Sequence, residues 1–450
     1  MSRIARLAAA AAAIVLAVAG CATNPVTGQR QFSLVTAQDE ARIGSEGYAA
    51  VVEEYGTYPD AAVQAYVDSV GWRLARVSHL PGVAWKFTVL DDPVVNAFAM
   101  PGGYIYITRG ILAHLNSEAQ LAGVLGHEIG HVTARHTAHR ITQQQLAGVG
   151  LGLVSIAVEG FQRYGQAAQT ALGLLFLKYS RDDETQADEL GVQYTTAAGY
   201  DPREIPATYA MLERVAERAG SRLPAFFSTH PDPGSRRERT GALAAQAAAG
   251  KQGLVVRGRD CVKRQDGLVF GQDPRQGYLE GDRYYHPALG FQLSFPSGWK
   301  VQDTRRAVMA QAPDQGAKLQ MTLVQGGTMS PGAYVAELER SARITGSSGA
   351  TETIGGYPAW AGRLRVAGDQ GQAVLLVAAY VRKSPGQMFE FLGSPGADGA
   401  GEGAILGAAR SFRPLTDAAR LAAEPDRVKV IPSPRAGKFQ DPPSRQNRST

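Results

Sequence analysis

Residues 117–131 of the chain read SEAQLAGVLGHEIGH, and this stretch decides how the segment around it folds. Ser117 and Gln120 lie three positions apart, which is the spacing of a helix-capping box. Apolar residues at helical spacing follow, so we expect a helix that runs from this cap to about Ile141. A helix of this length holds the two histidines of the stretch on rigid backbone.

The two histidines, His127 and His131, are four positions apart and therefore project from the same side of a helix. Both imidazoles can reach one cation from that side. Glu128 lies about 100° further round the helix and can address a water on that cation. The alternative is a pair of surface histidines, but the His-Glu-x-x-His pattern favours a zinc site.

A zinc ion usually takes at least three protein ligands, so a further ligand must come from elsewhere in the chain. Residues 179–188, YSRDDETQAD, form a strongly acidic and helical stretch that offers one. Glu184 and Asp188 are four positions apart there, so one could bind the metal while the other orients a metal-bound imidazole. Spacing alone does not choose between Asp182, Asp183 and Glu184, and a solvated acidic helix face is the alternative.

Four other stretches of the chain occur in a fixed order around the His-Glu-x-x-His helix and point to a known family. They are Asn24-Pro25-Val26-Thr27-Gly28, Asn96-Ala97-Phe98-Ala99 with Pro101-Gly102-Gly103, Tyr179-Ser180-Arg181 with Glu184 and Ala187-Asp188, and Ser228-Thr229-His230-Pro231. Together with the His-Glu-x-x-His helix they cover about residues 24–249. The chain here resembles the HtpX-like and CAAX-prenyl-endopeptidase-like zinc metallopeptidases, in their periplasmic lipoprotein branch.

The resemblance implies a ligand set and an activity. One zinc ion per chain is expected on His127, His131 and Glu184, with Asp188 as the partner of a zinc-bound imidazole. A zinc with three protein ligands activates a water near neutral pH. Glu128, beside the ligands, is then expected to act as the general base of a metalloendopeptidase.

The resemblance also implies roles for residues outside the helix. The chain at Asn96 and Ala97 is expected to be a strand edge that pairs with extended substrate. His230 is expected near the metal, where it could stabilise the oxyanion or occupy the fourth zinc position and hold the enzyme inactive. A structural histidine in a stiff, proline-rich turn is the alternative for His230.

The remaining histidines give weaker signals. On a continuous helix neither His136 nor His139 would share the face of His127, so we expect both at the surface or in the second sphere of the metal. His79, His114 and His286 sit beside turns without an acidic partner at a suitable spacing. None of them is expected to bind metal.

The amino terminus has the pattern of a secretory signal. Arg3 and Arg6 precede an apolar stretch, residues 7–19, that is too short to span a bilayer. Val18-Ala19-Gly20-Cys21 resembles a bacterial lipobox, in which the cysteine becomes the lipidated first residue. We therefore expect a signal peptide at residues 1–20 and a lipid on Cys21, sorted to the outer membrane because Ala22 follows. An ordinary signal peptide with an incidental Cys21 is the alternative.

Helices are expected at residues 36–55 and 59–77, and a small sheet from the alternating residues 85–89 and 104–108. The apolar runs 146–158 and 170–177 are too short to span a bilayer. Buried helices are favoured for these runs. The alternative is a membrane-dipping hairpin, which would make the protein an integral membrane peptidase.

From Leu254 the sequence changes to short alternating strands separated by Gly, Pro and Asp clusters. The expected divisions are the peptidase domain 21–250, a linker 251–285, an α+β module 286–415, and a charged, largely disordered tail 416–450. The start of the module resembles small domains similar to the photosystem PsbP protein. Recruitment of substrate by this module is a hypothesis.

Composition limits the function classes. A chain of 450 residues with 44% hydrophobic and 19% charged residues is typical of a folded protein with two or three domains. The formal charge is only +5, without a long basic block, so no nucleic-acid partner is expected. Two cysteines exclude a disulfide scaffold, and Cys261 is expected to be a lone thiol.

The sequence thus predicts an α+β protein, with a mainly helical zincin-type domain and a small sheet followed by a smaller strand-rich domain. Its expected function is hydrolysis of unfolded or mis-assembled envelope proteins in the bacterial periplasm, on a lipid anchor. That substrate class comes from the resemblance. The alternative function is a lipoprotein chaperone or assembly factor of the outer membrane with a latched or rarely active zinc site.

Overall fold

A computed structural model describes residues 21–146, 173–174, 178–218, 226, 229–230, 233–324, 326–367, 372–397 and 399–431. The expected signal peptide, most of the two apolar runs between residues 146 and 177, and residues 432–450 lie outside the described residues. Predictions for those segments therefore stay predictions.

The N-terminal domain is mainly helical. Its helices are α2 Ala37–Tyr55, α3 Ala61–Ala75, α4 Arg109–Leu112, α5 Glu118–Thr133, α6 His136–Leu146, α8 Arg181–Ala197, the 3-10 helix η3 Pro202–Glu204, α9 Ile205–Arg218, α11 Pro233–Ala248 and α12 Gly258–Arg264. Its strands are β1 Cys21–Thr23, β2 Arg30–Phe32, β3 Lys86–Leu90, β4 Ala97–Met100 and β5 Tyr104–Thr108.

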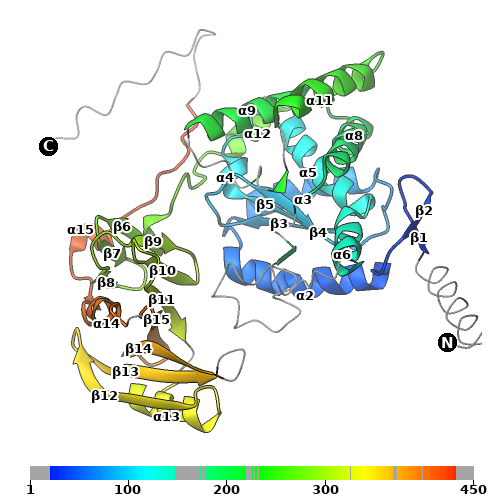
Figure 1. Ribbon diagram of the computed structural model, residues 1–450. Helices are drawn as coiled ribbons and strands as arrows, with labels where there is room; N and C mark the ends of the chain where they lie inside the picture. Colours follow the sequence, from blue (N-terminus) through cyan, green and yellow to red (C-terminus); the bar gives the residue numbers. More distant parts are fainter. Residues whose placement is uncertain are drawn as a thin grey trace, which may run out of the picture.

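A three-stranded sheet with the order β3-β5-β4 lies at the centre of this domain (Figure 1). β3 runs parallel to β5 and β4 runs antiparallel to it, so β4 is an edge strand. Side chains alternate across β5: Ile105 and Ile107 join the core formed with α3 and α5, whereas Tyr106 packs against α2. The sheet therefore supports α5 from one face, and its free edge belongs to β4.

The helix with the histidines begins as expected but ends earlier. The hydroxyl of Ser117 caps α5 by accepting a hydrogen bond from the Gln120 amide. The expected continuation to Ile141 is wrong, because α5 ends at Thr133 and Arg135 has a left-handed φ of 60°. The guanidinium of Arg135 bonds to Glu40 and to the Val35 carbonyl, and these contacts fix the break. α6 then starts at His136 in a new direction.

Helices α5 and α8 pack closely because glycines line their contact. A Cβ atom on Gly130 would lie 3.2 Å from the carbonyl oxygen of Ala187, and one on Gly191 would lie 3.1 Å from the amide nitrogen of His127. Both distances are tighter than ordinary Cβ contacts, so larger residues would push the helices apart. This approach brings the acidic residues of α8 to the histidines of α5.

The C-terminal domain is rich in strands. Its strands are β6 Tyr278–Glu280, β7 Arg283–His286, β8 Phe291–Ser294, β9 Lys300–Asp303, β10 Ala307–Gln311, β11 Lys318–Val324, β12 Gly346–Ile354, β13 Tyr357–Ala367, β14 Ala373–Ser384, β15 Gln387–Ser394 and β16 Arg413–Pro414. Its helical segments are η4 Pro274–Gln276, α13 Pro331–Arg340, α14 Glu402–Arg410 and α15 Ala418–Leu421.

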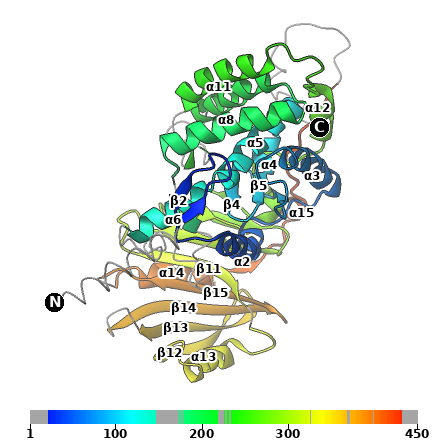
Figure 2. The same cartoon turned by 90° about the vertical axis from the view of Figure 1, so that its right-hand side faces the viewer.

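These strands form an antiparallel sheet with the order β12-β13-β14-β15-β11-β10-β9 and a smaller one with the order β16-β8-β7-β6. Figures 1 and 2 show α14 between the larger sheet and the smaller one, and α13 beside β12 and β13. The predicted α+β class, a helical domain with a small sheet followed by a strand-rich domain, is confirmed.

The expected domain boundaries differ from the observed ones in two places. Residues 251–285, expected to be a linker, contain α12, and Leu268 and Val269 belong to the core of the N-terminal domain. Residues 416–431 do not follow the expectation of a loose tail. They contain α15, and Val428 exchanges backbone hydrogen bonds with the 267–268 segment and packs against that same core.

Among the described residues, no helix combines the length and the apolar composition needed to cross a membrane.

Arg109 fixes the segment of the chain that leads into the C-terminal domain. It is fully buried, and its Nε donates to Asp91 Oδ1 at 2.8 Å. Its Nη1 donates to the carbonyl oxygens of Val269 and Gly271, at 3.1 and 2.7 Å. The same Asp91 accepts a hydrogen bond from Gln276, just before the first strand of the C-terminal domain.

The substitution Arg109→Met should destabilise the N-terminal domain by about 3 kcal/mol, because it leaves Asp91 Oδ1 and two carbonyl groups without their donor. Urea unfolding followed at the helical circular dichroism band measures the change. Arg42→Met is the control, since Arg42 is exposed in its ion pairs and its loss should cost less than about 1 kcal/mol. Equal unfolding midpoints for the two variants would contradict this role of Arg109.

Candidate metal centre

Four buried side chains from three segments converge on one point. His127 and His131 come from α5, Glu184 from α8, and His230 from the segment before α11. Each offers one ligand atom, and these atoms all lie within 4.8 Å of one another. His127 Nε2 is 3.0 Å from His131 Nε2 and 3.3 Å from His230 Nδ1, and Glu184 Oε1 is 2.9 Å from His230 Nδ1. Nitrogen and carboxylate donors of this kind suit zinc.

The outer nitrogen of His127 faces a carboxylate. His127 Nδ1 lies 3.1 Å from Asp188 Oδ1 and can donate its hydrogen to that oxygen. The lone pair of Nε2 is then free to bind a metal. Burial lowers the pKa of His127 to about 3, and the ring is therefore neutral at pH 7, as a metal ligand must be. Asp188 lies where the sequence-based resemblance puts it, as a partner of a ligand rather than a ligand.

The outer nitrogen of His131 faces a third histidine instead. His131 Nδ1 lies 2.9 Å from His136 Nδ1, and His136 Nε2 lies 3.0 Å from the amide oxygen of Gln186. An amide oxygen only accepts, so His136 carries its hydrogen on Nε2 and can accept from His131 through Nδ1. These two hydrogen bonds keep the hydrogen of His131 on Nδ1, so its Nε2 is free to bind a metal. The turn at Arg135 makes the contact, since residues five apart on a continuous helix point about 140° away from each other.

Glu128 lies beside the cluster without joining it. It is fully buried, and neither of its carboxylate oxygens has a hydrogen-bond partner among the described residues. Burial raises the pKa of Glu128 to about 7. Its Oε1 is 3.7 Å from His230 Nε2, another buried atom without a hydrogen-bond partner in the described structure. A carboxylate held in this way is available to take up and release a proton.

Arg236 of α11 supplies the positive charge next to the site. Its Nη1 is 2.5 Å from Glu184 Oε2, and its Nη2 donates to Asp188 Oδ1 at 2.7 Å and to the Tyr209 hydroxyl at 2.8 Å. Burial alone would raise the pKa of Glu184 and Asp188. Contacts with His230, His131 and Arg236 nevertheless hold the pKa of Glu184 below its usual range, and contacts with Arg236 and His127 do the same for Asp188. Both carboxylates therefore stay ionised.

The charges and donors of the site fit a zinc ion. Glu184 and Asp188 are ionised, Glu128 is buried without a partner, and Arg236 is the one fully buried guanidinium in contact with them among the described residues. Arg239 also contacts Asp188, at 2.8 Å, so Glu128 is the buried carboxylate that no arginine contacts, and a metal ion beside it would supply a positive charge. It would also give the converging imidazole nitrogens and carboxylate oxygens a shared partner. The residues that would hold it are His127, His131 and Glu184, with His230 as a fourth donor.

Two aromatic rings stack on the histidines. Tyr179 lies on His131 with ring centroids 3.8 Å apart, and Phe226 lies on His230 with centroids 4.4 Å apart. The backbone of Tyr179 also bonds to the carbonyl of Thr229, one residue before His230. The cluster is therefore closed on this side, and His230 is fixed at the metal site rather than in a separate turn.

The expected substrate edge is an edge strand. Asn96 precedes β4 and Ala97 begins it, and β4 packs against α5. The carbonyl oxygen of Asn96 accepts from Thr108 of β5, and Asn96 Oδ1 is buried without a hydrogen-bond partner in the described structure. The outer side of β4 pairs with no other strand in the described part of the chain.

The structure does not bring the other singled-out residues to this site. His79 contacts the Tyr194 hydroxyl at 2.6 Å, and His114 packs edge-on against Phe270. Cys261 is a buried free thiol in α12, as expected for a lone cysteine. Cys21, the expected lipid attachment, begins β1.

Sequence reasoning missed Arg236, Tyr209 and Gln186. Arg236 lies six positions after His230 in the sequence and on the next helix, but an arginine in a basic run such as Arg236-Arg237-Glu238-Arg239 is typical of an exposed helix face. Only its burial distinguishes it. His136 was expected at the surface or in the second sphere, and the structure puts it in the second sphere.

Comparison with known proteins supports this description. Residues 61–243 match the model of peptidase family M48. This match supports the family-level part of the sequence-based resemblance for this segment, whereas the HtpX-like and CAAX-type branch stays a prediction. Family M48, together with the buried cluster, supports the expected zinc cofactor and metalloendopeptidase class.

Curated relatives match the same region. The mitochondrial metalloendopeptidase OMA1 of Arabidopsis thaliana is 35% identical over 182 residues, which are 40% of this chain and 35% of that protein. Its Schizosaccharomyces pombe namesake is 32% identical over 218 residues, 47% of this chain and 63% of that protein. The beta-barrel assembly-enhancing protease of Escherichia coli is 32% identical over 189 residues, 39% of this chain and 38% of that protein. The chain thus spans less than two thirds of the length of each.

Among solved structures, the cyanobacterial PsbP of Synechocystis matches 29% of this chain and 91% of that protein, at 12% identity and a TM-score of 0.23. A TM-score this low carries no argument, so the PsbP-like character of the C-terminal domain stays a prediction.

The substitution His136→Leu should weaken zinc binding by about 10- to 100-fold, because His131 loses the acceptor that fixes its tautomer. His136→Asn should restore binding, since an amide oxygen can accept in place of Nδ1. Competition with a chelating dye measures zinc affinity without reference to activity. His139→Leu is the control, because the ring of His139 forms a hydrogen bond with Gln143 and with no other described residue. Unchanged zinc affinity in His136→Leu would show that His136 does not orient His131.

Proposed function

We propose that the protein is a zinc-dependent endopeptidase that hydrolyses polypeptides in the bacterial envelope. The single observation that carries the proposal is the buried cluster of His127, His131 and Glu184 with Glu128 beside it. Three nitrogen and oxygen ligands next to an unpaired carboxylate are the arrangement of catalytic zinc sites that hydrolyse peptides.

The chemistry divides between the ion and the chain. When bound, zinc would act as a Lewis acid on a peptide carbonyl and would activate water. Glu128 takes the proton of the attacking water and later passes it to the leaving amine, a role that suits a buried carboxylate with both oxygens free. Asp188 and the His136–Gln186 pair keep the two ligand imidazoles in the tautomer with Nε2 unprotonated.

The substrate would bind as an extended strand along the free edge of β4. An edge strand offers unpaired backbone groups, which hold a peptide without regard to its side chains. Asn96 and Ala97 lie at the start of this edge. The buried Oδ1 of Asn96 is a further acceptor there. Such binding suits unfolded or mis-assembled polypeptides, which present extended backbone.

The envelope location rests on sequence and on relatives. Arg3 and Arg6, the apolar residues 7–19 and Cys21 form a lipoprotein signal, which predicts a periplasmic protein anchored to the outer membrane. The Escherichia coli relative is named a beta-barrel assembly-enhancing protease, which fits a role in envelope protein quality control. The OMA1 relatives are mitochondrial by name, so the relatives alone do not select the compartment.

The second candidate function is a chaperone or assembly factor with a latched zinc site. His230 supports it, since its Nδ1 lies among the ligand atoms and its ring is fully buried. A fourth protein ligand would occupy the position that water needs. Our proposal combines the two functions: His230 is a gating ligand that holds the resting peptidase inactive, and its release opens the site.

The substitution Glu128→Gln should lower the peptidase rate by on the order of 10²- to 10⁴-fold, because the general base is lost. Zinc affinity should stay unchanged, since Glu128 is not in the ligand set. Cleavage of an unfolded model protein and chelator competition measure the two quantities. If a strain with Glu128→Gln keeps the full cellular role of the protein, the chaperone function replaces the peptidase function.

The substitution His230→Ala should raise the peptidase rate at saturating zinc and weaken zinc binding, because one of four donors is removed. Both effects are read from the same cleavage and competition assays. A lower rate with unchanged zinc affinity would instead indicate that His230 stabilises the oxyanion. No change in either quantity would indicate a structural histidine.

A further inference from the structure

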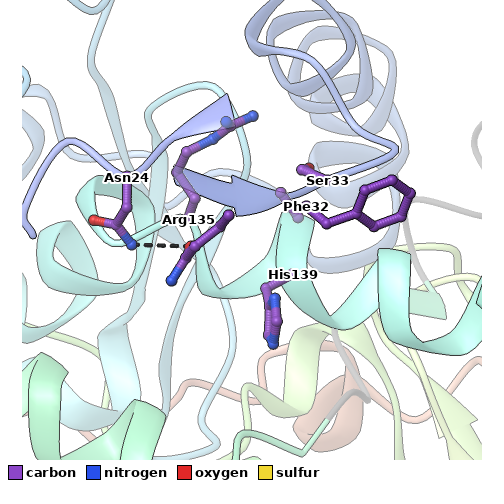
Figure 3. A pocket seen from close by; sticks show the side chains of 7 residues that line it. Asn24, Phe32, Ser33, Arg135 and His139 are labelled. Atoms are coloured by element: carbon purple, nitrogen blue, oxygen red, sulfur yellow. Dashed lines mark hydrogen bonds between the residues drawn. The ribbon is translucent and has the colours of Figure 1, made fainter. Parts of the chain in front are cut away.

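The hairpin formed by β1 and β2 is rigidly attached to the metal-site helix. The side chain of Asn24 accepts hydrogen bonds from the amides of Val26 and Thr27, which shapes the turn. Its Nδ2 donates to the carbonyl of Ala134, at the end of α5, and to Gln31 Oε1 (Figure 3). The Asn-Pro-Val-Thr-Gly motif thus fastens the start of the described chain to the domain core.

Cys21 lies only three residues before Asn24, and the residues between them belong to the paired strand β1. Its backbone pairs with Phe32 across the hairpin. Three residues span at most about 11 Å even when fully extended. A lipid on Cys21 would therefore hold the N-terminal domain directly against the membrane, and the surface next to the hairpin would face the bilayer.

That surface carries exposed apolar side chains. Phe32 is 39% exposed, Leu34 is 47% exposed and Leu146 is 65% exposed. Figure 3 shows the ring of Phe32 pointing away from Asn24 and out of the pocket that the hairpin forms with α6. The amide of Leu34 donates to Thr142 Oγ1, and Leu146 lies one helical turn beyond Thr142. The three side chains therefore belong to one face, made by the hairpin and α6.

The charge of this face suits an anionic surface. Residues 21–36 and 135–146 contain three arginines and no aspartate or glutamate. Arg135 is engaged with Glu40, and Arg140 lies about 200° round α6 from Thr142, away from the hairpin. Arg30 is exposed and lies two positions from Phe32 on β2, so the two side chains share one side of the strand. Arginines beside exposed aromatic and aliphatic side chains are the composition of protein surfaces that rest in the membrane interface.

We propose that the membrane-facing surface, defined as Arg30, Phe32, Leu34 and Leu146, inserts its apolar side chains into the interface of a phospholipid bilayer. The occupant is the lipid itself rather than a protein partner. This inference rests on the proposed lipid anchor at Cys21, which would bring the surface to the bilayer. Figure 1 shows the hairpin and the C-terminal domain on opposite sides of the N-terminal domain, so the C-terminal domain would face away from the membrane.

The test uses the full lipidated protein in vesicles of phosphatidylethanolamine and phosphatidylglycerol. Single cysteines replace Phe32, Leu146 or, as a control, Leu375, an apolar residue of the C-terminal domain that is 43% exposed. Each receives an environment-sensitive fluorophore; the lipid would block the thiol of Cys21, and Cys261 is buried. The probes at positions 32 and 146 should shift to shorter wavelength and be quenched by spin-labelled lipid. The probe at position 375 should do neither.

Emission and quenching at positions 32 and 146 that equal those at position 375 would overturn the membrane-facing surface. Because the vesicles contain only lipid, a surface meant for a protein partner would give this same negative result.

Mass spectrometry of the purified protein separates this failure from failure of the anchor. If Cys21 carries no lipid, the anchor is wrong, and the same three probes are read with excess vesicles on unlipidated protein in which Cys21→Ser removes the second reactive thiol. Shifts at positions 32 and 146 would then support the surface by itself, and their absence would overturn it.

Discussion

The close packing of α5 against α8 is the constraint on which the site depends. Gly126, Gly130 and Gly191 let the two backbones approach so closely that a Cβ on any of them would lie 3.1 to 3.2 Å from backbone atoms of the other helix. At this separation the carboxylates of α8 reach the imidazoles of α5. The sheet, through β4 and β5, and the helices α3 and α9 support α5 from its other sides.

Close approach alone would put like charges together in a buried place, and Arg236 resolves that conflict. Its guanidinium contacts both Glu184 and Asp188 and holds their pKa values low. Transfer of a carboxylate from water to the protein interior costs several kcal/mol unless a partner charge compensates it. The same buried, fixed carboxylates then orient His127, while the turn at Arg135 brings in His136 to orient His131. Folding and ligand geometry therefore depend on the same contacts.

Local signals in the sequence predict much of this arrangement. The caps at Thr36 and Ser117 and the spacing of His127 and His131 act over three or four residues, so they could be identified without a structure. The break at Arg135 could not, because contacts with Glu40 and Val35, about 100 positions away, fix it. Arg236 was missed for the same reason. The choice of Glu184 over its acidic neighbours required the family resemblance, since spacing alone left three candidates.

X-ray absorption at the zinc edge of the resting full-length protein tests the central claim most directly, since it counts the donors on the metal. The account predicts a shell of nitrogen and oxygen only, at about 2.0–2.1 Å, with three imidazoles from His127, His131 and His230 and one carboxylate from Glu184. A sulfur scatterer at about 2.3 Å, or a shell with fewer than three imidazoles, would contradict it.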